Sequence, residues 1–337
     1  NIAIVIFLVI CIITFPSESI KAAYDGLIIW FTLVLPSLFP FFIGIELLLN
    51  LGVMSFIGTL LEPIMRPIFN VPGEGSFALA MSFISGYPVG VKIISKLRQD
   101  GVVTTAEAQR LVSFCSTSGP LFIMGTVSMG MFHSSEIGIL LAICHYAAAI
   151  IVGLFFSFYK KNTWTYRPRR NKGIIKKAFV NLHTDCKKSP PFGIILKEAV
   201  AESIDTISMI GGFIIIFSVL LNILESVGFI NLISGILFIA LKKLTIQPNL
   251  IKAFISGLFE ITLGCKLVSS ASNIKLIHQL AITAFILSWS GLSIHAQSIS
   301  ILSATDINPR LYILSKFLQA IISLVLIYIL YPIYVNF

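Results

Sequence analysis

The stretch that decides the fold is residues 83–92, which read FISGYPVGVK. Its surroundings, residues 76–94, are apolar enough to enter a lipid bilayer, yet two glycines and a proline fall in the middle. Proline removes a backbone donor and breaks a helix, and glycine lets two backbones approach closely. Non-helical backbone persists at membrane depth only where protein or a water-filled cavity satisfies its polar groups. We therefore predict a broken helix or re-entrant hairpin over residues 76–94.

The same kind of break recurs at a nearly constant distance along the chain. The FISG of residues 83–86 returns at residues 254–257, an offset of 171 (254 − 83), inside a second interrupted apolar stretch, residues 250–268. The STSG of residues 116–119 returns as the SWSG of residues 288–291, an offset of 172 (288 − 116). Two separate Ser-Gly breaks that share an offset indicate an internal repeat. We therefore expect two related halves with two helix breaks each.

The composition is that of an integral membrane protein. Of the 337 residues, 56% are hydrophobic and 12% are charged, whereas about 25% of the residues of soluble domains are charged. Apolar runs long enough to cross the hydrocarbon layer recur along the whole chain. We predict an all-α polytopic membrane protein with about seven to eight transmembrane helices plus two re-entrant or broken-helix hairpins. The expected transmembrane helices are residues 2–15, 26–51, 108–131, 136–159, 200–224, 277–302 and 311–334, and residues 228–241 are left open as a further short span.

Positive charge is concentrated in residues 160–197, between two apolar blocks. Cytoplasmic loops of membrane proteins carry an excess of lysine and arginine. We therefore predict that this loop is cytoplasmic, which explains the net charge of +9 without a nucleic-acid partner. The eleven basic residues of the loop are Lys160, Lys161, Arg167, Arg169, Arg170, Lys172, Lys176, Lys177, Lys187, Lys188 and Lys197.

With the basic loop inside, the order of the spans makes the two halves inverted copies of each other. The hairpin around Ser85 then enters from the cytoplasm, and the hairpin around Ser256 enters from the far side. Many secondary transporters have this architecture, and their broken helices meet near the midplane to form the substrate site. Four lysines on the far side count against this topology: Lys242, Lys243, Lys252 and Lys266. The expected units are residues 1–24 (first transmembrane helix and connector), 25–159 (first repeat), 160–197 (basic loop) and 198–337 (second repeat).

Residues at the breaks are the candidates for a substrate site. A broken helix leaves amides and carbonyls free to face a solute, and hydroxyl groups can hydrogen-bond one. The alternatives are a tight turn between packed helices and hydroxyl groups that bond to carbonyls of their own helix. The candidate substrate-binding residues are Ser85, Gly86, Tyr87, Pro88, Gly90, Lys92, Ser116, Thr117, Ser118, Gly119, Ser256, Gly257, Ser290 and Gly291.

Glu260 is an acid inside an apolar stretch, just after the expected tip of the second hairpin. An ionisable group in a bilayer is costly, so such a residue usually serves a function. We consider it a candidate group for coupling transport to H⁺ or Na⁺. The alternative is a structural salt bridge to Lys266 or Lys92.

Signatures of enzymes, cofactors and metals are missing from the sequence. The five cysteines are widely spaced, and the five histidines show no metal-ligand spacing. There is no G-x-S-x-G, C-x-x-C or H-E-x-x-H motif. We therefore expect no catalytic residues, no cofactor and no metal.

Three motifs resemble those of one family. They are SGYPVGVK at residues 85–92, FCSTSGP at residues 114–120 followed by LFIMGTV, and FISGLFEITLG at residues 254–264. They are similar to motifs of the YlbJ family of sporulation integral membrane proteins, which carries a nucleoside-recognition gate domain distantly similar to concentrative nucleoside transporters. The resemblance runs over nearly the whole chain. The first two motifs are specific, and the third is shared with wider gate-domain relatives.

The resemblance implies a role in spore formation, as a step that carries dipicolinic acid from the mother cell across the outer forespore membrane. A planar dicarboxylate would suit free amides at helix N-termini, hydroxyl groups and a cation such as Lys92. The second repeat has LFE at residues 258–260 where the first has YPV at residues 87–89, so the two hairpins are expected to divide substrate binding and coupling. Uptake of a nucleoside or another small solute, and a non-transporting gate or partner subunit, stay open as alternatives.

Overall fold

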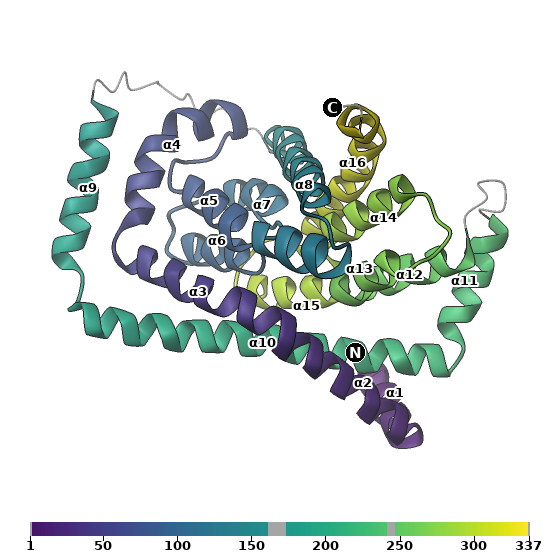
Figure 1. Cartoon of the computed structure of the whole chain (residues 1–337). Helices are drawn as coiled ribbons and strands as arrows, with labels where there is room; N and C mark the ends of the chain where they lie inside the picture. Colours follow the sequence, from purple (N-terminus) through teal and green to yellow (C-terminus); the bar gives the residue numbers. More distant parts are fainter. Residues whose placement is uncertain (1, 161–172, 241–246, 336–337) are drawn as a thin grey trace.

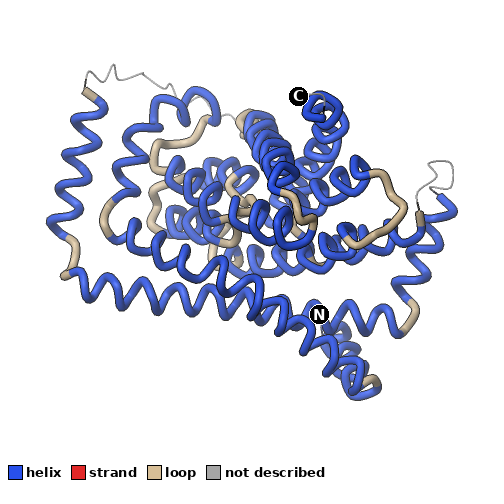
Figure 2. The backbone as a smooth tube through the Cα atoms, viewed as in Figure 1, coloured by secondary structure: helices blue, strands red, loops and turns tan. Residues whose placement is uncertain are grey.

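The computed structural model describes residues 2–160, 173–240 and 247–335, and within these ranges the chain forms helices and no strand (Figures 1 and 2). The helices up to the basic loop are α1 (Ile2–Thr14), α2 (Pro16–Ile29), η1 (Trp30–Val34), α3 (Leu35–Asn50), α4 (Val53–Phe69), α5 (Gly75–Ser85), α6 (Val89–Gln99), α7 (Thr105–Phe114), η2 (Leu121–Met129) and α8 (Ser135–Phe156). Those that follow are α9 (Ile174–Lys188), α10 (Phe192–Ser226), α11 (Phe229–Ala240), α12 (Pro248–Phe259), α13 (Ile261–Ser269), α14 (Leu276–Trp289), α15 (Gly291–Leu302) and α16 (Pro309–Val335).

The order of elements in the first half returns in the second half. The continuous helix formed by α2, η1 and α3 corresponds to α10, and α4 corresponds to α11. The hairpin of α5 and α6 corresponds to that of α12 and α13, the broken helix of α7 and η2 to that of α14 and α15, and α8 to α16. The internal repeat predicted from the Ser-Gly breaks is therefore a repeat of whole elements.

Equivalent loops of the two halves lie at opposite faces of the molecule. Loop 100–104, after the first hairpin, meets loop 303–308 through the pair Arg98–Asp306, whose Nε–Oδ1 distance is 2.8 Å. Loop 270–275, after the second hairpin, instead lies near loop 130–134, because residues Met131 and Ser269 line one cavity. Helix α8 runs between these two faces, and its 22 residues span about 33 Å. The halves are therefore inverted copies, as predicted.

The continuous helix formed by α2, η1 and α3 crosses helix α10, and small residues allow their backbones to approach. Helix α10 packs along both α2 and α3. A Cβ atom on Gly26 would lie 2.8 Å from Oγ of Ser218, and one on Gly211 would lie 2.6 Å from the Trp30 ring. The Trp30 indole also donates a 3.0 Å hydrogen bond to the carbonyl of Ile207. This crossing forms one wall behind the helix breaks.

Long apolar helices and an apolar surface mark a polytopic membrane protein. Four helical segments among the described residues are long and apolar enough to cross a bilayer: Ser135–Phe156, Phe192–Ser226, Leu276–Leu302 and Pro309–Tyr334. Large hydrophobic side chains are exposed along them, including Phe155 at 74% and Ile329 at 55%. Such an apolar surface is stable against lipid and unstable in water.

The expected segment 108–131 is interrupted at residues 116–119, where the sequence predicts a helix break. Helix α7 ends at Phe114, and a non-helical segment over residues 115–120 precedes η2. Pro120 disfavours helical backbone at Gly119, and the Ser116–Thr117–Ser118 run bonds to other elements. In the second half, the expected segment 277–302 is interrupted at the corresponding point, where Ser290 and Gly291 have φ values of 77° and 75°.

The second hairpin breaks four residues later than its Ser-Gly pair indicates. Ser256 and Gly257 lie inside α12, where the Ser256 carbonyl accepts a 2.8 Å hydrogen bond from the Glu260 amide. The break lies at Glu260, whose φ of −139° and ψ of 120° are extended. Gly257 instead provides a close contact, because a Cβ atom on Gly264 would meet its backbone nitrogen at 2.7 Å.

Three further helices extend the predicted organisation. Residues 228–241, left open above, contain α11, and α4 lies between the second predicted span and the first hairpin. The basic segment 160–197 contains α9, which packs on α4 through Phe179 and Phe56, with ring centroids 5.1 Å apart. Residues 161–172 and 241–246 lie outside the described residues. The second of these ranges contains Lys242 and Lys243.

Candidate transport site between the helix breaks

The two breaks of the first half touch each other through glycine. A Cβ atom on Gly119 would lie 2.8 Å from the Ser85 carbonyl oxygen and 3.2 Å from the Gly86 nitrogen. Gly86 has a φ of 83°, which side chains other than glycine rarely adopt. Glycine is therefore required at both positions if the hairpin tip is to reach the segment 115–120.

Hydrogen bonds hold the segment 115–120 in its extended shape. Thr117 donates from Oγ1 to the Ser82 carbonyl at 2.8 Å, and its amide donates to the Ser82 hydroxyl at 3.1 Å. The Ser118 amide donates to Nε2 of His145 at 2.9 Å, so the ring proton lies on Nδ1, which meets the Ser288 hydroxyl at 2.8 Å. Most of the polar atoms freed by this break are therefore used by the protein.

The two breaks of the second half also touch each other. A Cβ atom on Gly291 would lie 3.1 Å from the carbonyl oxygen of Phe259, and the Trp289 indole donates a 3.0 Å hydrogen bond to Leu258. Glu260 is 1% exposed, and its carboxylate accepts a 2.6 Å hydrogen bond from the Leu263 amide. It thus caps the N-terminus of α13, where a negative charge is favoured by the helix dipole. No salt bridge to Lys266 or Lys92 forms.

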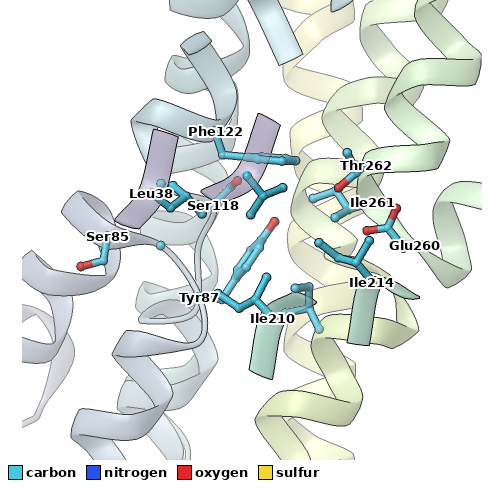
Figure 3. Close-up of a pocket in the computed structure, with 14 residues that line it drawn as sticks. Leu38, Ser85, Tyr87, Ser118, Phe122, Ile210, Ile214, Glu260, Ile261 and Thr262 are labelled. Carbon is cyan, nitrogen blue, oxygen red and sulfur yellow. The ribbon is translucent and has the colours of Figure 1, made fainter. Parts of the chain in front are cut away.

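A buried cavity lies where three of these breaks converge, those at Gly86, Gly119 and Glu260, and its volume is 40 Å³. Tyr87 stands between the two halves, with Ser85 on one side and Glu260 on the other (Figure 3). Its ring belongs to the first hairpin, and its hydroxyl group reaches to 3.5 Å from the Leu287 carbonyl of the second half. The cavity is lined by Val34, Leu38, Ser85, Gly86, Tyr87, Ser118, Gly119, Phe122, Ile210, Ile214, Glu260, Ile261, Thr262 and Ile294.

The candidate residues from the sequence divide into three groups. Those that line the cavity are Ser85, Gly86, Tyr87, Ser118, Gly119 and Glu260. Those that pack the breaks without lining it are Pro88, Gly90, Ser116, Thr117, Ser290 and Gly291. Those outside the site are Lys92, Ser256 and Gly257.

Lys92 does not supply a positive charge to the cavity. It lies on the exposed side of α6, and its Nζ is 2.6 Å from Oε2 of Glu202 on α10. Both side chains are about half exposed, at 47% and 53%. The cavity lining among the described residues therefore contains one ionisable carboxyl group, that of Glu260, and no lysine or arginine.

A second set of buried polar residues, which the sequence reasoning missed, lies behind the segment 115–120. The Tyr312 hydroxyl lies 3.3 Å from that of Ser116, and Lys316 donates to the Ser116 carbonyl. The amide of Gln319 donates to the His145 carbonyl at 3.3 Å. The signal was present in the sequence, because Lys316 and Gln319 interrupt the otherwise apolar residues 311–334.

A larger depression lies away from the breaks. It has a volume of 670 Å³ and lies between the start of α8 and the end of α16. Its lining includes His133, Glu136 and Tyr334, but no break residue. Among the described residues, no group of histidine, cysteine or acidic side chains could hold a metal ion. The arrangement at the breaks suits a solute that binds to backbone and hydroxyl groups.

Comparisons with known proteins show the family to which the chain belongs. The pattern of the Gate family, described as nucleoside recognition, matches residues 31–160. The sporulation integral membrane protein YlbJ of Bacillus subtilis is 42% identical over 335 residues, which cover 98% of this chain and 82% of that protein. The chain belongs to the family of this sporulation membrane protein. An uncharacterized protein of Alkalihalophilus pseudofirmus is 33% identical over 127 residues, 36% of this chain and 27% of that protein. No solved structure matches.

Proposed function

We propose that the protein is a transporter of sporulation that carries dipicolinic acid from the mother cell across the outer forespore membrane. The observation that carries the proposal is the meeting of three helix breaks, from two inverted halves, around one buried cavity, with the fourth break at Gly291 packed against the second hairpin. Secondary transporters bind their substrates at such points, because broken helices expose backbone polar groups inside the bilayer. Membership in a sporulation family supports the cellular role.

The size of the cavity indicates a closed conformation. Sites for small organic molecules usually measure about 300–1,000 Å³, whereas this cavity measures 40 Å³ and accommodates a few water molecules. Close glycine contacts, hydrogen bonds and the buried side chain of Cys115 join the first hairpin to the segment 115–120. We infer that the hairpin tips separate from this segment when the solute enters.

Glu260 is the coupling group in this proposal. A charged carboxylate in the cavity would repel a dicarboxylate substrate, because two like charges in a low-dielectric site cannot both remain uncompensated. A proton or a sodium ion on Glu260 removes this repulsion. The solute and the ion would then bind together, which couples their movement.

Flux into proteoliposomes tests the proposal. Purified protein should carry labelled dipicolinic acid, and an imposed proton or sodium gradient should change the rate. Ser85→Ala and Gly86→Ala should reduce this flux, while Lys92→Met, which alters a surface lysine, should retain it. Absence of flux from wild-type protein, with and without each gradient, contradicts the proposal and favours a non-transporting gate or partner subunit.

A neutral nucleoside is the second candidate substrate. The lining of the cavity favours it in one respect, because it offers hydroxyl groups and a carboxyl group but no lysine or arginine. The Gate family is described by nucleoside recognition. Labelled uridine in the same proteoliposomes distinguishes the two substrates: uptake of uridine without uptake of dipicolinic acid decides for the nucleoside.

The proposed function also places the protein in the outer forespore membrane. A fluorescent fusion should surround the forespore in sporulating cells, and spores of the deletion strain should lack dipicolinic acid. Normal dipicolinic acid content in those spores would contradict the proposed role. The basic loop 160–197 should face the mother-cell cytoplasm.

A further inference from the structure

Lys316, in the first third of α16, is a fully buried lysine without an acidic partner. Its side chain is 0% exposed, and its ammonium group donates one hydrogen bond, to the carbonyl oxygen of Ser116. The salt bridges found among the described residues join other side chains, none of which is Lys316. Two of the three donor positions of this group therefore have no partner that the structure shows.

Arg110, a buried arginine among the described residues, shows how a structural cation is normally satisfied. Arg110 is 4% exposed, and its guanidinium group donates to three carbonyl oxygens, those of Asn70, Tyr159 and Lys160, at 2.6–2.9 Å. Taking a charge out of water costs several kcal/mol, and attraction to a partner must offset that cost. Lys316 has one carbonyl for this purpose, so a structural role alone does not account for its burial.

His295 lies beside Lys316 and is also incompletely paired. It is 2% exposed, its ring lies against the backbone of Trp289, and neither ring nitrogen has a well-formed hydrogen-bond partner. The centroid of the ring is 4.4 Å from that of Trp289 and 5.5 Å from that of Tyr312. The other titratable groups that face Lys316 are Cys115 at the end of α7 and His145 on α8.

This pair of residues is separated from the cavity by Tyr87. The ring of Tyr87 lines the cavity, and its hydroxyl group lies near Ser290 and faces Tyr312, which is one helical turn before Lys316. From the other direction, Ser116 binds Lys316, and two residues later Ser118 lines the cavity. Because Lys316 and His295 are 0% and 2% exposed, the Tyr87 side chain would have to move before a solute in the cavity could reach them.

We propose that Lys316 and His295 form a carboxylate-binding subsite behind Tyr87, where they hold a charged end of the transported solute. The inference deepens the proposed function, on which it rests. An ammonium group is a strong partner for a carboxylate, and a histidine N–H adds a second donor. The subsite supplies the positive charge that the cavity lining lacks, and it fits an organic anion better than a neutral nucleoside.

Binding measurements on purified full-length protein in lipid nanodiscs test the subsite. The probes are pyridine-2,6-dicarboxylate, pyridine-2-carboxylate and benzene-1,3-dicarboxylate. Lys316→Met should weaken the binding of the anion that wild-type protein prefers by about 10- to 100-fold, the factor that a hydrogen bond to a charged group contributes. Lys316→Arg, which keeps the charge, should recover most of this affinity. Lys92→Met, a matched change on the surface, should bind like wild type.

The outcomes separate the subsite from the proposed function. Wild-type affinity in Lys316→Met overturns the subsite and leaves transport intact. Lys316-dependent binding of another carboxylate supports the subsite and excludes dipicolinic acid as the substrate. No binding of any of the three anions by wild-type protein overturns both proposals.

A second measurement covers the case in which Lys316→Met does not fold. Because Trp289 packs on His295, an anion in the subsite should change the fluorescence of wild-type protein. Trp289→Phe should abolish this change, whereas Trp30→Phe should retain it. Anion binding that leaves the Trp289 fluorescence unchanged overturns the subsite.

Discussion

Single glycines determine how closely the helix breaks approach. Gly90, at the start of α6, faces the segment 115–120, and a Cβ atom there would overlap the Cys115 carbonyl oxygen and lie 2.8 Å from Cβ of Ser82. Backbone at that position cannot move without moving the whole hairpin. The Gly-rich composition of the FISGYPVGVK stretch is therefore a packing requirement as well as a break signal.

We predict that Gly90→Ala lowers stability by about 1–3 kcal/mol, the range for overpacking a close contact. Thermal unfolding in detergent should show a lower midpoint, and flux should fall as well. Gly125→Ala in η2 is the matched control, because a Cβ atom there meets nothing within 4 Å. Equal midpoints for the two variants would show that the hairpin does not depend on this contact.

Glu260 combines a cap with the proposed coupling role, and two substitutions separate these roles. Glu260→Gln keeps an oxygen that can accept the hydrogen bond from Leu263, so its unfolding midpoint should stay near that of wild type. Its flux should no longer respond to a proton or sodium gradient. Glu260→Ala removes the cap and should cost about 0.5–2 kcal/mol. A gradient response in Glu260→Gln equal to that of wild type would rule out coupling through this carboxyl group.

At the scale of elements, an ionic clamp joins the first hairpin to the loop before α16. Arg98 donates to both carboxylate oxygens of Asp306 at 2.8 Å, and Thr105 donates to one of them at 2.6 Å. The hydrogen bonds from Arg98 and then Thr105 hold the pKa of Asp306 well below its usual range. The clamp therefore connects an element of each half at the same face.

The clamp predicts how stability depends on pH. The Asp306 carboxyl group binds its proton more weakly in the folded protein than in the unfolded chain. The clamp therefore contributes its full stabilisation above the unfolded pKa of about 4, and this stabilisation is lost as the pH falls toward the lower pKa of the folded protein. Asp306→Asn should lower stability at pH 7 by about 0–1 kcal/mol, because the pair is exposed. The difference in unfolding midpoint between wild type and variant should narrow below about pH 4. Asp100→Asn, with the same charge change on a neighbouring loop outside the clamp, is the control for the loss of one negative charge.

The elements also show how far sequence reasoning reaches. The hairpin over residues 76–94 was predicted correctly, because glycine and proline both break the helix at its centre. The second hairpin was predicted over residues 250–268, where it lies, but its break was placed four residues early, because Gly257 is tolerated inside a helix when it packs closely and the break depends on the cap that Glu260 forms. Lys316 was missed because α16 carries no break motif, and His295, which follows the Ser290–Gly291 break in α15, was not connected with it. Their proximity depends on tertiary packing, which single-sequence patterns do not report.

At the scale of the whole molecule, the inverted repeat accounts for features that composition alone leaves unexplained. Each half contributes a hairpin and a broken helix, and neither half encloses the cavity alone. Because equivalent loops lie at opposite faces, the proposed transport would open one hairpin toward one side and the other hairpin toward the opposite side. In that proposal the two hairpins act as two gates around a single cavity.

This symmetry predicts that equivalent loops of the two halves face opposite sides of the membrane. Asp100, after the first hairpin, and Ser272, after the second, occupy equivalent exposed loops at opposite faces. Each can carry a cysteine in a Cys186→Ser background, because the other four cysteines are buried. A membrane-impermeant maleimide applied to intact cells should label Ser272→Cys, and it should label Asp100→Cys only after permeabilisation, because Asp100 shares a face with the start of the basic loop. Labelling of both variants from one side would contradict an inverted repeat that spans the bilayer. Labelling with the two sides exchanged would preserve the inversion and move the basic loop to the outside.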